Sequence, residues 1–165
     1  ACLKMRNSGM DDKYTINLPI IKQSLGQGGL FSITRSSPRA HKEALEKLAL
    51  YFMREEGYTN LQFVAGEVSN PEYHGFAFTE LALDAFGEEL AEMPTRLLGG
   101  GCFRKRSFAD GEHWVLDWVW IHPYARNKGL FSNHIDYFKE TFGNFYPEFP
   151  ISKAMKHLFE NKIRT

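Results

Sequence analysis

The residues best placed to do chemistry lie where a strand rich in aromatic side chains runs into a basic turn. The strand ends near His122, and residues 126–129 then read Arg-Asn-Lys-Gly, just before an apolar helix is expected to begin. The first backbone N–H groups of a helix lack partners within it, and together with the positive end of the helix dipole they attract anions. This stretch therefore predicts a site for a phosphorylated ligand, with the basic side chains of the turn adding charge.

Two long strands are expected to lead into this turn. Residues 97–108 and 113–121 are predicted to be strands, and the Asp-Gly dipeptide at residues 110–111 is suited to join them as a hairpin. Three consecutive glycines at residues 99–101 predict a bulge or the close approach of another backbone. The second strand of this hairpin is predicted to be buried at the centre of the fold.

A helix and an extended segment are expected after the turn. Residues 130–142 carry Phe and Ile at helical spacing, and Gly143 is suited to end the helix. Prolines favour an extended chain over residues 145–151, and Ser152 is placed to cap a last helix.

The part of the chain before the hairpin predicts further strands and a long helix. Residues 30–34 and 61–65 alternate as strands do, and a helix is expected to begin near Pro38 and to end at Gly57. Residues 81–93 favour a helix by their Ala, Leu and Glu content, although a glycine interrupts them. Together these elements predict an α+β fold, in which helices flank a mostly antiparallel central sheet.

Length and composition indicate one globular domain. The chain has 165 residues, of which 43% are hydrophobic and 24% charged. Residues 1–13 are polar and are expected to be a loose N-terminus, which leaves residues 14–165 as the single domain. Phe alone accounts for 14 residues, and we expect most of these rings to form the core.

The charge balance and the cysteine content exclude several classes of function. Twenty Lys and Arg balance twenty Asp and Glu, which argues against nucleic acid as a partner. The two cysteines and the spacing of the six histidines predict no metal site. There is no apolar run near the roughly 18 residues that span a bilayer, and no signal-peptide segment, so we expect a cytoplasmic protein without a membrane partner.

The basic turn resembles the pyrophosphate loop of the GNAT-type N-acetyltransferase superfamily, whose pattern is Arg/Gln-x-x-Gly-x-Gly/Ala after a central strand. Arg126 and Gly129 match this pattern, and Phe131 stands at the position of its last Gly or Ala. The preceding strand ends in Ile-His-Pro, similar to the ending common in that superfamily. With the order of the elements around it, the resemblance covers about residues 95–162.

The resemblance implies a GNAT-like acyl-CoA N-acyltransferase fold with acetyl-CoA as co-substrate. In such folds the central strand separates from its neighbour, and the pantetheine arm pairs with the exposed backbone as an added strand would. The turn amides would hold the pyrophosphate. The residues expected to bind the coenzyme are Val119, Trp120, Ile121, Arg126, Asn127, Lys128, Gly129, Leu130 and Phe131.

Asp117 is the candidate general base. Many members of the superfamily use an acidic residue on the central strands, and strict alternation would place Asp117 on one face with Val119 and Ile121. Desolvation by neighbours such as Trp118 would strengthen its carboxylate as a base. The alternative is a buried structural Asp bonded to a neighbouring group, and both interpretations stay open.

The general acid usual in the superfamily is absent from this sequence. It is a Tyr four residues after a small residue on the last helix, and counting from Ala154 gives Leu158. Ser152 and His157 are the substitutes on the same helix. The alternatives are that Ser152 only caps the helix and that His157 is a solvated surface residue.

We therefore expect an acetyl-CoA-dependent N-acetyltransferase that acts on a small-molecule or peptide amine, which the sequence does not identify. The alternative is a non-catalytic module with a GNAT-like fold, either a sensor of CoA or acyl-CoA or an interaction protein. Because the last predicted element is a helix, a second copy could complete the edge of the sheet, which predicts a homodimer.

Overall fold

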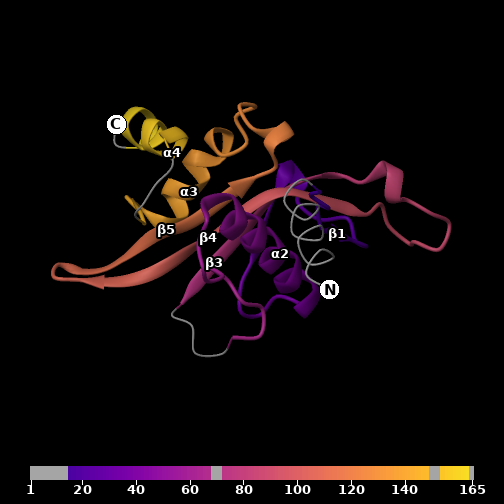
Figure 1. Cartoon of the computed structure of the whole chain (residues 1–165), viewed down its shortest axis with the longest axis horizontal. Helices are drawn as coiled ribbons and strands as arrows, with labels where there is room; N and C mark the ends of the chain where they lie inside the picture. Colours follow the sequence, from indigo (N-terminus) through magenta and orange to yellow (C-terminus); the bar gives the residue numbers. More distant parts are fainter. Residues whose placement is uncertain (1–14, 68–71, 149–152, 164–165) are drawn as a thin grey trace, which may run out of the picture.

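The computed structural model describes residues 15–67, 72–148 and 153–163, and in these residues six strands form one sheet (Figure 1). The strands are β1 (Ile20–Ile21), β2 (Leu30–Ile33), β3 (Tyr73–Leu81), β4 (Thr95–Phe108), β5 (Gly111–Ile121) and β6 (Tyr146–Pro147). Their order is β2-β3-β4-β5-β6, and β1 pairs with β4. All pairs are antiparallel except β5 with β6, which are parallel.

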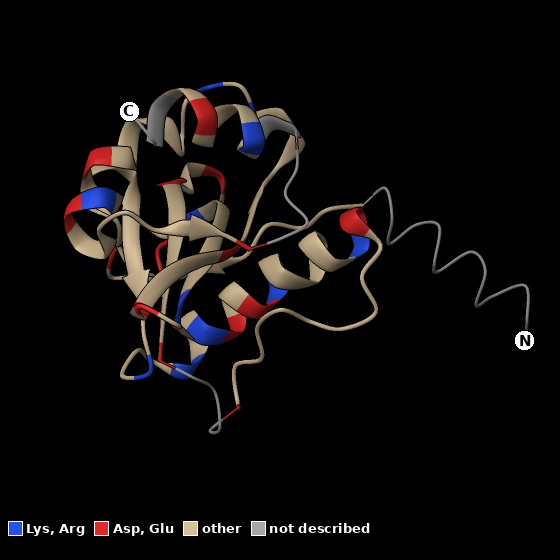
Figure 2. Ribbon diagram, turned by 90° about the vertical axis from the view of Figure 1, so that its left-hand side faces the viewer, with Lys and Arg blue, Asp and Glu red and all other residues tan. Residues whose placement is uncertain are grey.

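Helices cover both faces of the sheet. The long helix α2 (Arg39–Glu56) lies on one face, and α3 (Ile135–Phe142) and α4 (Lys153–Leu158) lie on the other (Figure 2). The remaining helical turns are short, at Gln27–Gly29, Leu83–Ala85, Pro123–Ala125, Ser132–His134 and Phe159–Ile163. The predicted α+β fold, with a mostly antiparallel sheet between helices, is confirmed.

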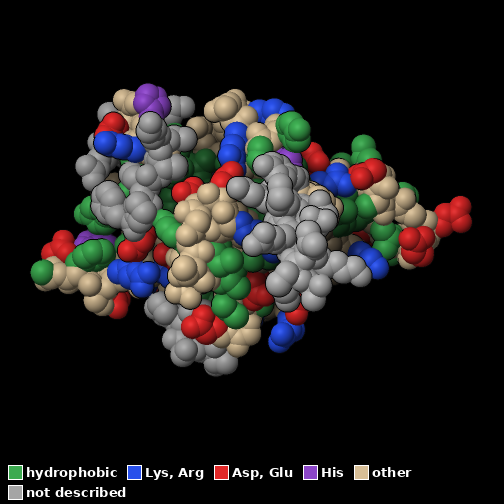
Figure 3. All heavy atoms as spheres, in the orientation of Figure 1, with side chains coloured by type: hydrophobic (Ala, Val, Ile, Leu, Met, Phe, Trp, Pro, Cys, Tyr) green, Lys and Arg blue, Asp and Glu red, His purple; other side chains and the backbone are tan. Residues whose placement is uncertain are grey.

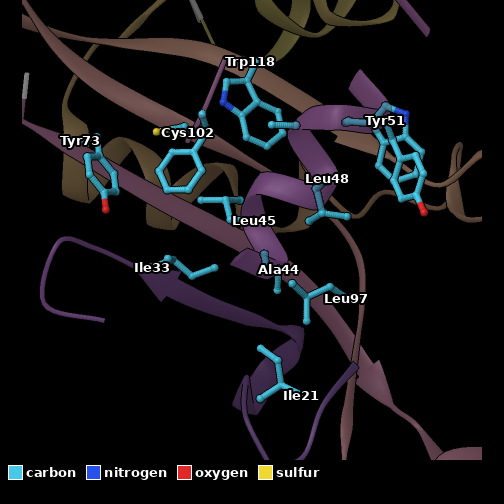
Figure 4. Packing of buried hydrophobic residues seen from close by; sticks show 14 residues of the cluster. Ile21, Ile33, Ala44, Leu45, Leu48, Tyr51, Tyr73, Leu97, Cys102 and Trp118 are labelled. Carbon is cyan, nitrogen blue, oxygen red and sulfur yellow. The ribbon is translucent and has the colours of Figure 1, made fainter. Parts of the chain in front are cut away.

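Each face of the sheet carries its own apolar cluster. The α2 side packs Leu45 and Leu48 against Trp118 and Trp120 of β5 (Figure 4). The α3 side is built from aromatic rings, namely Phe76, Phe78, Phe103, Phe131, Phe138, Phe142, Phe145 and Phe159. The expectation that phenylalanine forms the core is confirmed, and these large rings contribute most of the apolar area buried on that side.

The long helix and the hairpin form as the sequence predicts. Gly57 ends α2 in a left-handed conformation, with φ of 73°, which a residue without Cβ adopts at little cost. The helix begins at Arg39, directly after Pro38, and no side chain caps it. The hydroxyl of Ser37 instead accepts a hydrogen bond from the Thr34 N–H at 2.8 Å. The β4–β5 hairpin forms, but its turn is at residues 109–110, and Gly111 of the expected Asp-Gly dipeptide pairs with Phe108 as the first residue of β5.

Three local predictions are wrong. Residues 61–65 form no strand; Phe63 there is fully buried, and the Ala65 N–H donates to the carboxylate of Glu46 at 2.7 Å. Residues 81–93 contain a single helical turn, Leu83–Ala85, in a segment that projects at the right of Figure 1. The helix expected at 130–142 becomes α-helical only at Ile135.

The three glycines of β4 lie between two register shifts of the sheet, the first at Phe78 and Thr79 of β3 and the second at Cys102 and Phe103 of β4. A Cβ on Gly100 would lie 2.4 Å from the carbonyl oxygen of Phe76, so the predicted close backbone approach is confirmed. The second shift pairs Cys102 with Trp118 and Phe103 with Leu116, which leaves the intervening residue of β5 without a partner in β4. That residue is Asp117, and it forms a β-bulge.

Candidate active site

The central strand β5 is only partly paired on the side of β6. The two strands meet at Val115–Tyr146 and Leu116–Pro147, and the last bond is from the Glu148 N–H to the Leu116 carbonyl, at 2.9 Å. Past Leu116, the described residues place no strand on that side of β5. Residues 117–121 therefore form an open edge.

The backbone groups of Val119 and Ile121 point into this opening. The N–H of His122 donates to the Leu98 carbonyl of β4 at 2.9 Å, so by alternation Trp120 also bonds toward β4. The N–H and C=O groups of Val119 and Ile121 consequently turn the other way. The open edge thus offers two residues to which an extended chain could pair.

A cleft of about 210 Å³ lies along the open edge. Its lining comes from β5, the basic turn, the end of α2 and α4, and consists of Val119, Trp120, Ile121, Arg126, Phe131, Glu55, Glu56 and Met155. Val119 and Ile121 contact the cluster under α3, whereas Trp120 belongs to the cluster under α2. The cleft therefore brings together predicted coenzyme residues from the strand and from the turn.

The basic turn contains two left-handed residues and is followed, in the described part of the chain, by free backbone amides. Asn127 and Gly129 are left-handed, with φ of 61° and 75°, and the Asn133 N–H bonds to the Gly129 carbonyl at 2.8 Å to begin the helical turns. Among the described residues, the N–H groups of Leu130 and Phe131 have no hydrogen-bond partner. Free amides at the start of a helical segment are the groups that bind phosphate oxygens.

The side chain of Arg126 lies across the cleft. Its Nε donates to the Ile121 carbonyl at 2.8 Å, and its Nη2 lies 2.7 Å from each carboxylate oxygen of Glu55. The other basic residue of the turn, Lys128, lines a second hollow of about 380 Å³ together with Leu130 and His122. Predicted coenzyme residues thus line two hollows, one with Arg126 and one with Lys128.

His122 is a possible base that the sequence reasoning did not single out, although the Ile-His-Pro ending marked its position. Its Nδ1 accepts the Tyr124 N–H at 3.2 Å, which leaves the proton of the neutral ring on Nε2. Burial, and then the positive charge of Arg126, lowers the pKa of His122. The imidazole is therefore neutral near pH 7.

The predicted face of Asp117 is wrong, because the bulge shifts the alternation of β5. Its carboxylate accepts a hydrogen bond from Arg104 Nε at 2.8 Å, and both side chains are only 6% exposed. Arg104 also donates to the Gln62 carbonyl at 2.8 Å and lies over the ring of Tyr73 in the α2-side cluster. Asp117 therefore lies on the α2 side of the sheet, opposite to Val119 and its cluster.

This ion pair gives Asp117 the structural role that the sequence had left as the alternative. A buried carboxylate that is paired with a guanidinium is stabilised as an acceptor of hydrogen bonds, and taking a proton would break that pair. Its catalytic role stays a prediction.

Of the two predicted acids on the last helix, the structure describes only His157, which does not line the cleft. Ser152 lies outside the described residues. His157 is exposed on α4, where its Nδ1 lies 2.9 Å from the side-chain nitrogen of Asn161. Met155 of the same helix does line the cleft, and Leu158 packs in the Phe-rich cluster. The catalytic roles of Ser152 and His157 stay predictions.

Two further observations concern metal binding and membrane-spanning helices. Among the described residues, no group of three or more His, Cys, Asp or Glu side chains is placed to hold a metal ion. In the same part of the chain, no helix is long and apolar enough to cross a membrane.

No family model and no curated protein matches the sequence, but solved structures share its fold. An aminoglycoside acetyltransferase from an uncultured soil metagenomic sample, crystallised with sisomicin, has a TM-score of 0.50 at 9% identity, over 82% of this chain and 88% of that one. A protein described as a "probable acetyltransferase" has a TM-score of 0.50 at 15% identity, over 79% and 86%. At such identities the likeness establishes the fold alone. The chain has the GNAT-like fold of these acetyltransferases.

Proposed function

We propose that this protein is an acetyl-CoA-dependent N-acetyltransferase that acts on a small-molecule or peptide amine. The observation that carries the proposal is the open edge of β5, where Val119 and Ile121 present backbone groups beside a cleft. The fold shared with acetyltransferases supports it, as does the adjacent turn with free amides.

The chain's own residues would divide the coenzyme between them. Val119 and Ile121 would pair with the amides of the pantetheine arm, as an added strand pairs with a sheet edge. The amides of Leu130 and Phe131, with the charge of Arg126, would hold the pyrophosphate. Acetyl-CoA would supply the acetyl group as a thioester, whose carbon forms a bond to the acceptor nitrogen while its bond to sulfur breaks.

The proton of the acceptor amine needs a base on this chain. Asp117 remains one candidate, although a proton transfer to it competes with its ion pair to Arg104. The neutral imidazole of His122, at the end of the same strand, is a second candidate and has a lowered pKa. Position 158 is Leu, so no Tyr stands there to protonate the leaving thiolate of CoA. This thiolate leaves readily enough for water to donate the proton.

A thiol-release assay with acetyl-CoA and a panel of amines tests the proposal. The panel should contain sisomicin, because a protein of the same fold was crystallised with it, as well as spermidine and peptides with a free N-terminal amine. Turnover on any member supports the proposal. Mass spectrometry of the acceptor should show the gain of one acetyl group, and the absence of turnover across the panel would count against the proposal.

A coenzyme-binding module without catalysis is the second candidate. Two observations favour it: Asp117 is held by Arg104, and an apolar Leu158 stands where the superfamily has its acid. This candidate predicts that acetyl-CoA binds equally well to the unmodified chain and to Asp117→Asn, and that neither form acetylates an amine. Acetylation by the unmodified chain excludes it.

A further inference from the structure

Arg126 is held in place by two partners that the proposed function would require it to leave. Its Nη2 is 2.7 Å from both oxygens of the Glu55 carboxylate, and its Nε is 2.8 Å from the Ile121 carbonyl oxygen. All three residues line the same cleft along the open edge of β5. The arginine therefore bridges the last turn of α2 and the central strand.

This arrangement occupies two of the groups that would bind the coenzyme. The Ile121 carbonyl is an acceptor on the open edge, and a pantetheine amide cannot bond to it in the same way while Arg126 does. The charge of Arg126 is neutralised by Glu55, which reduces its attraction for a pyrophosphate. The side chain crosses the cleft that the coenzyme would enter.

The position of Glu55 in α2 is unfavourable for a carboxylate. It is in the last turn of α2, close to Glu56, and the negative end of a helix dipole disfavours carboxylates there. The ion pair with Arg126 offsets this repulsion. It joins residues that are 71 positions apart in the chain, so it fixes how the end of α2 sits against the basic turn.

We propose that Glu55 is a positioning residue that competes with the pyrophosphate of acetyl-CoA for Arg126, an inference that rests on the proposed function. Binding of the coenzyme transfers Arg126 from Glu55 and the Ile121 carbonyl to the pyrophosphate, and the same movement uncovers the open edge for the pantetheine arm. Glu55 thereby weakens coenzyme binding, and the cleft fills only when the phosphates replace the carboxylate.

The exchange is energetically accessible because both partners are solvated. The side chain of Arg126 is 37% exposed and that of Glu55 is 41% exposed. Exposed ion pairs contribute little, so removing the competitor should tighten binding by only about two- to five-fold. A buried pair such as Arg104 with Asp117 could not be exchanged in this way.

Isothermal titration with acetyl-CoA tests the inference on the full chain, on Glu55→Gln, on Arg126→Ala and on the double variant. Glu56→Gln is the matched control, because Glu56 lines the same cleft and carries the same charge but makes no bond to Arg126 in the described structure. We expect Glu55→Gln to lower Kd by about two- to five-fold and Glu56→Gln to change it less. In the Arg126→Ala background, Glu55→Gln should have no further effect.

The outcomes separate this inference from the function on which it rests. If acetyl-CoA binds but Glu55→Gln leaves Kd unchanged or raises it, Glu55 does not compete with the coenzyme for Arg126. The proposed coenzyme site is unaffected by that result. If Glu56→Gln lowers Kd as much as Glu55→Gln does, or if Glu55→Gln lowers Kd even without Arg126, the effect is general charge repulsion of the coenzyme. Either result would also contradict the competition for Arg126. If no variant binds acetyl-CoA, the proposed function and this inference both fail.

Discussion

At the scale of single residues, the type of a side chain was predicted more readily than its partner. Asp117 is the only ionisable residue between two tryptophans of the central strand, at positions 114 and 118, and the sequence marks it as unusual. Its partner is Arg104, 13 positions away on the neighbouring strand. The bulge that turns Asp117 toward Arg104 has no signature in the residues of β5, so the ion pair could not be predicted.

Replacing Asp117 by Asn should destabilise the fold by about 3 kcal/mol, because it leaves the buried guanidinium of Arg104 without its counter-charge. Unfolding by urea measures this free energy. The matched control is Asp110→Asn, which removes an exposed carboxylate from the hairpin turn and should leave the midpoint nearly unchanged. If Asp117→Asn lowers the free energy of unfolding by less than about 1 kcal/mol, the ion pair contributes little to stability. That result would favour Asp117 as the general base.

At the scale of elements, the strength of the local signal decided what could be predicted. Helix α2 forms as expected because its apolar spacing and Gly57 agree, and the β4–β5 hairpin forms with its turn one residue before the expected dipeptide. Residues 81–93 have helical composition, but the one helical turn that forms, Leu83–Ala85, buries no residue, and short helices without such packing are not stable. Glu55, the partner of Arg126, lies on a different element, and no pattern in the sequence predicts that these two residues pair.

The glycines of β4 give a prediction at this scale. A Cβ at Gly100 would lie 2.4 Å from the Phe76 carbonyl oxygen and 3.1 Å from Cδ1 of Leu48, so Gly100→Ala should destabilise the protein by about 1–3 kcal/mol. Gly66→Ala is the control, because no atom lies within 4 Å of its Cβ position. Denaturant midpoints compare the two, and equal midpoints would contradict the close packing of β3 against β4.

At the scale of the whole molecule, charge is distributed without a dominant sign. Basic and acidic side chains are mixed over the face shown in Figure 3, as the balanced totals in the sequence predict. The arrangement of two aromatic-rich layers about one sheet was predictable from composition and strand order. The separation of β5 from β6 was expected only from the resemblance to the superfamily, because no local pattern marks where two strands part.

Stability should fall as the pH is lowered from 7.5 to 5. Burial lowers the pKa of His41, His74, His122 and His134, so the folded state keeps these rings neutral while the unfolded chain binds protons at its ordinary pKa of 6.5. Their contribution is therefore complete above pH 6.5 and is lost as the pH falls through the lower folded values.

Urea unfolding across this pH range measures the effect, and proton uptake on unfolding near pH 6 should accompany it. The pKa of the Asp84 carboxyl is also low, because of its hydrogen bonds from Arg96, but its contribution is lost only below its ordinary value of 3.8. A stability that stays constant or rises between pH 7.5 and 5 would contradict the burial of the histidines.

The most direct test of the account is the titration of the purified chain with acetyl-CoA, in parallel with Arg126→Ala and with Arg39→Ala as a control for charge. Arg39 is also paired with a glutamate, Glu43 at 2.8 Å, but at the first turn of α2. We predict saturable binding that Arg126→Ala weakens by about ten-fold, since a charge-assisted contact to the pyrophosphate is lost, and that Arg39→Ala leaves unchanged. Absence of binding, or equal binding by all three proteins, would contradict the placement of a coenzyme along the open edge of β5.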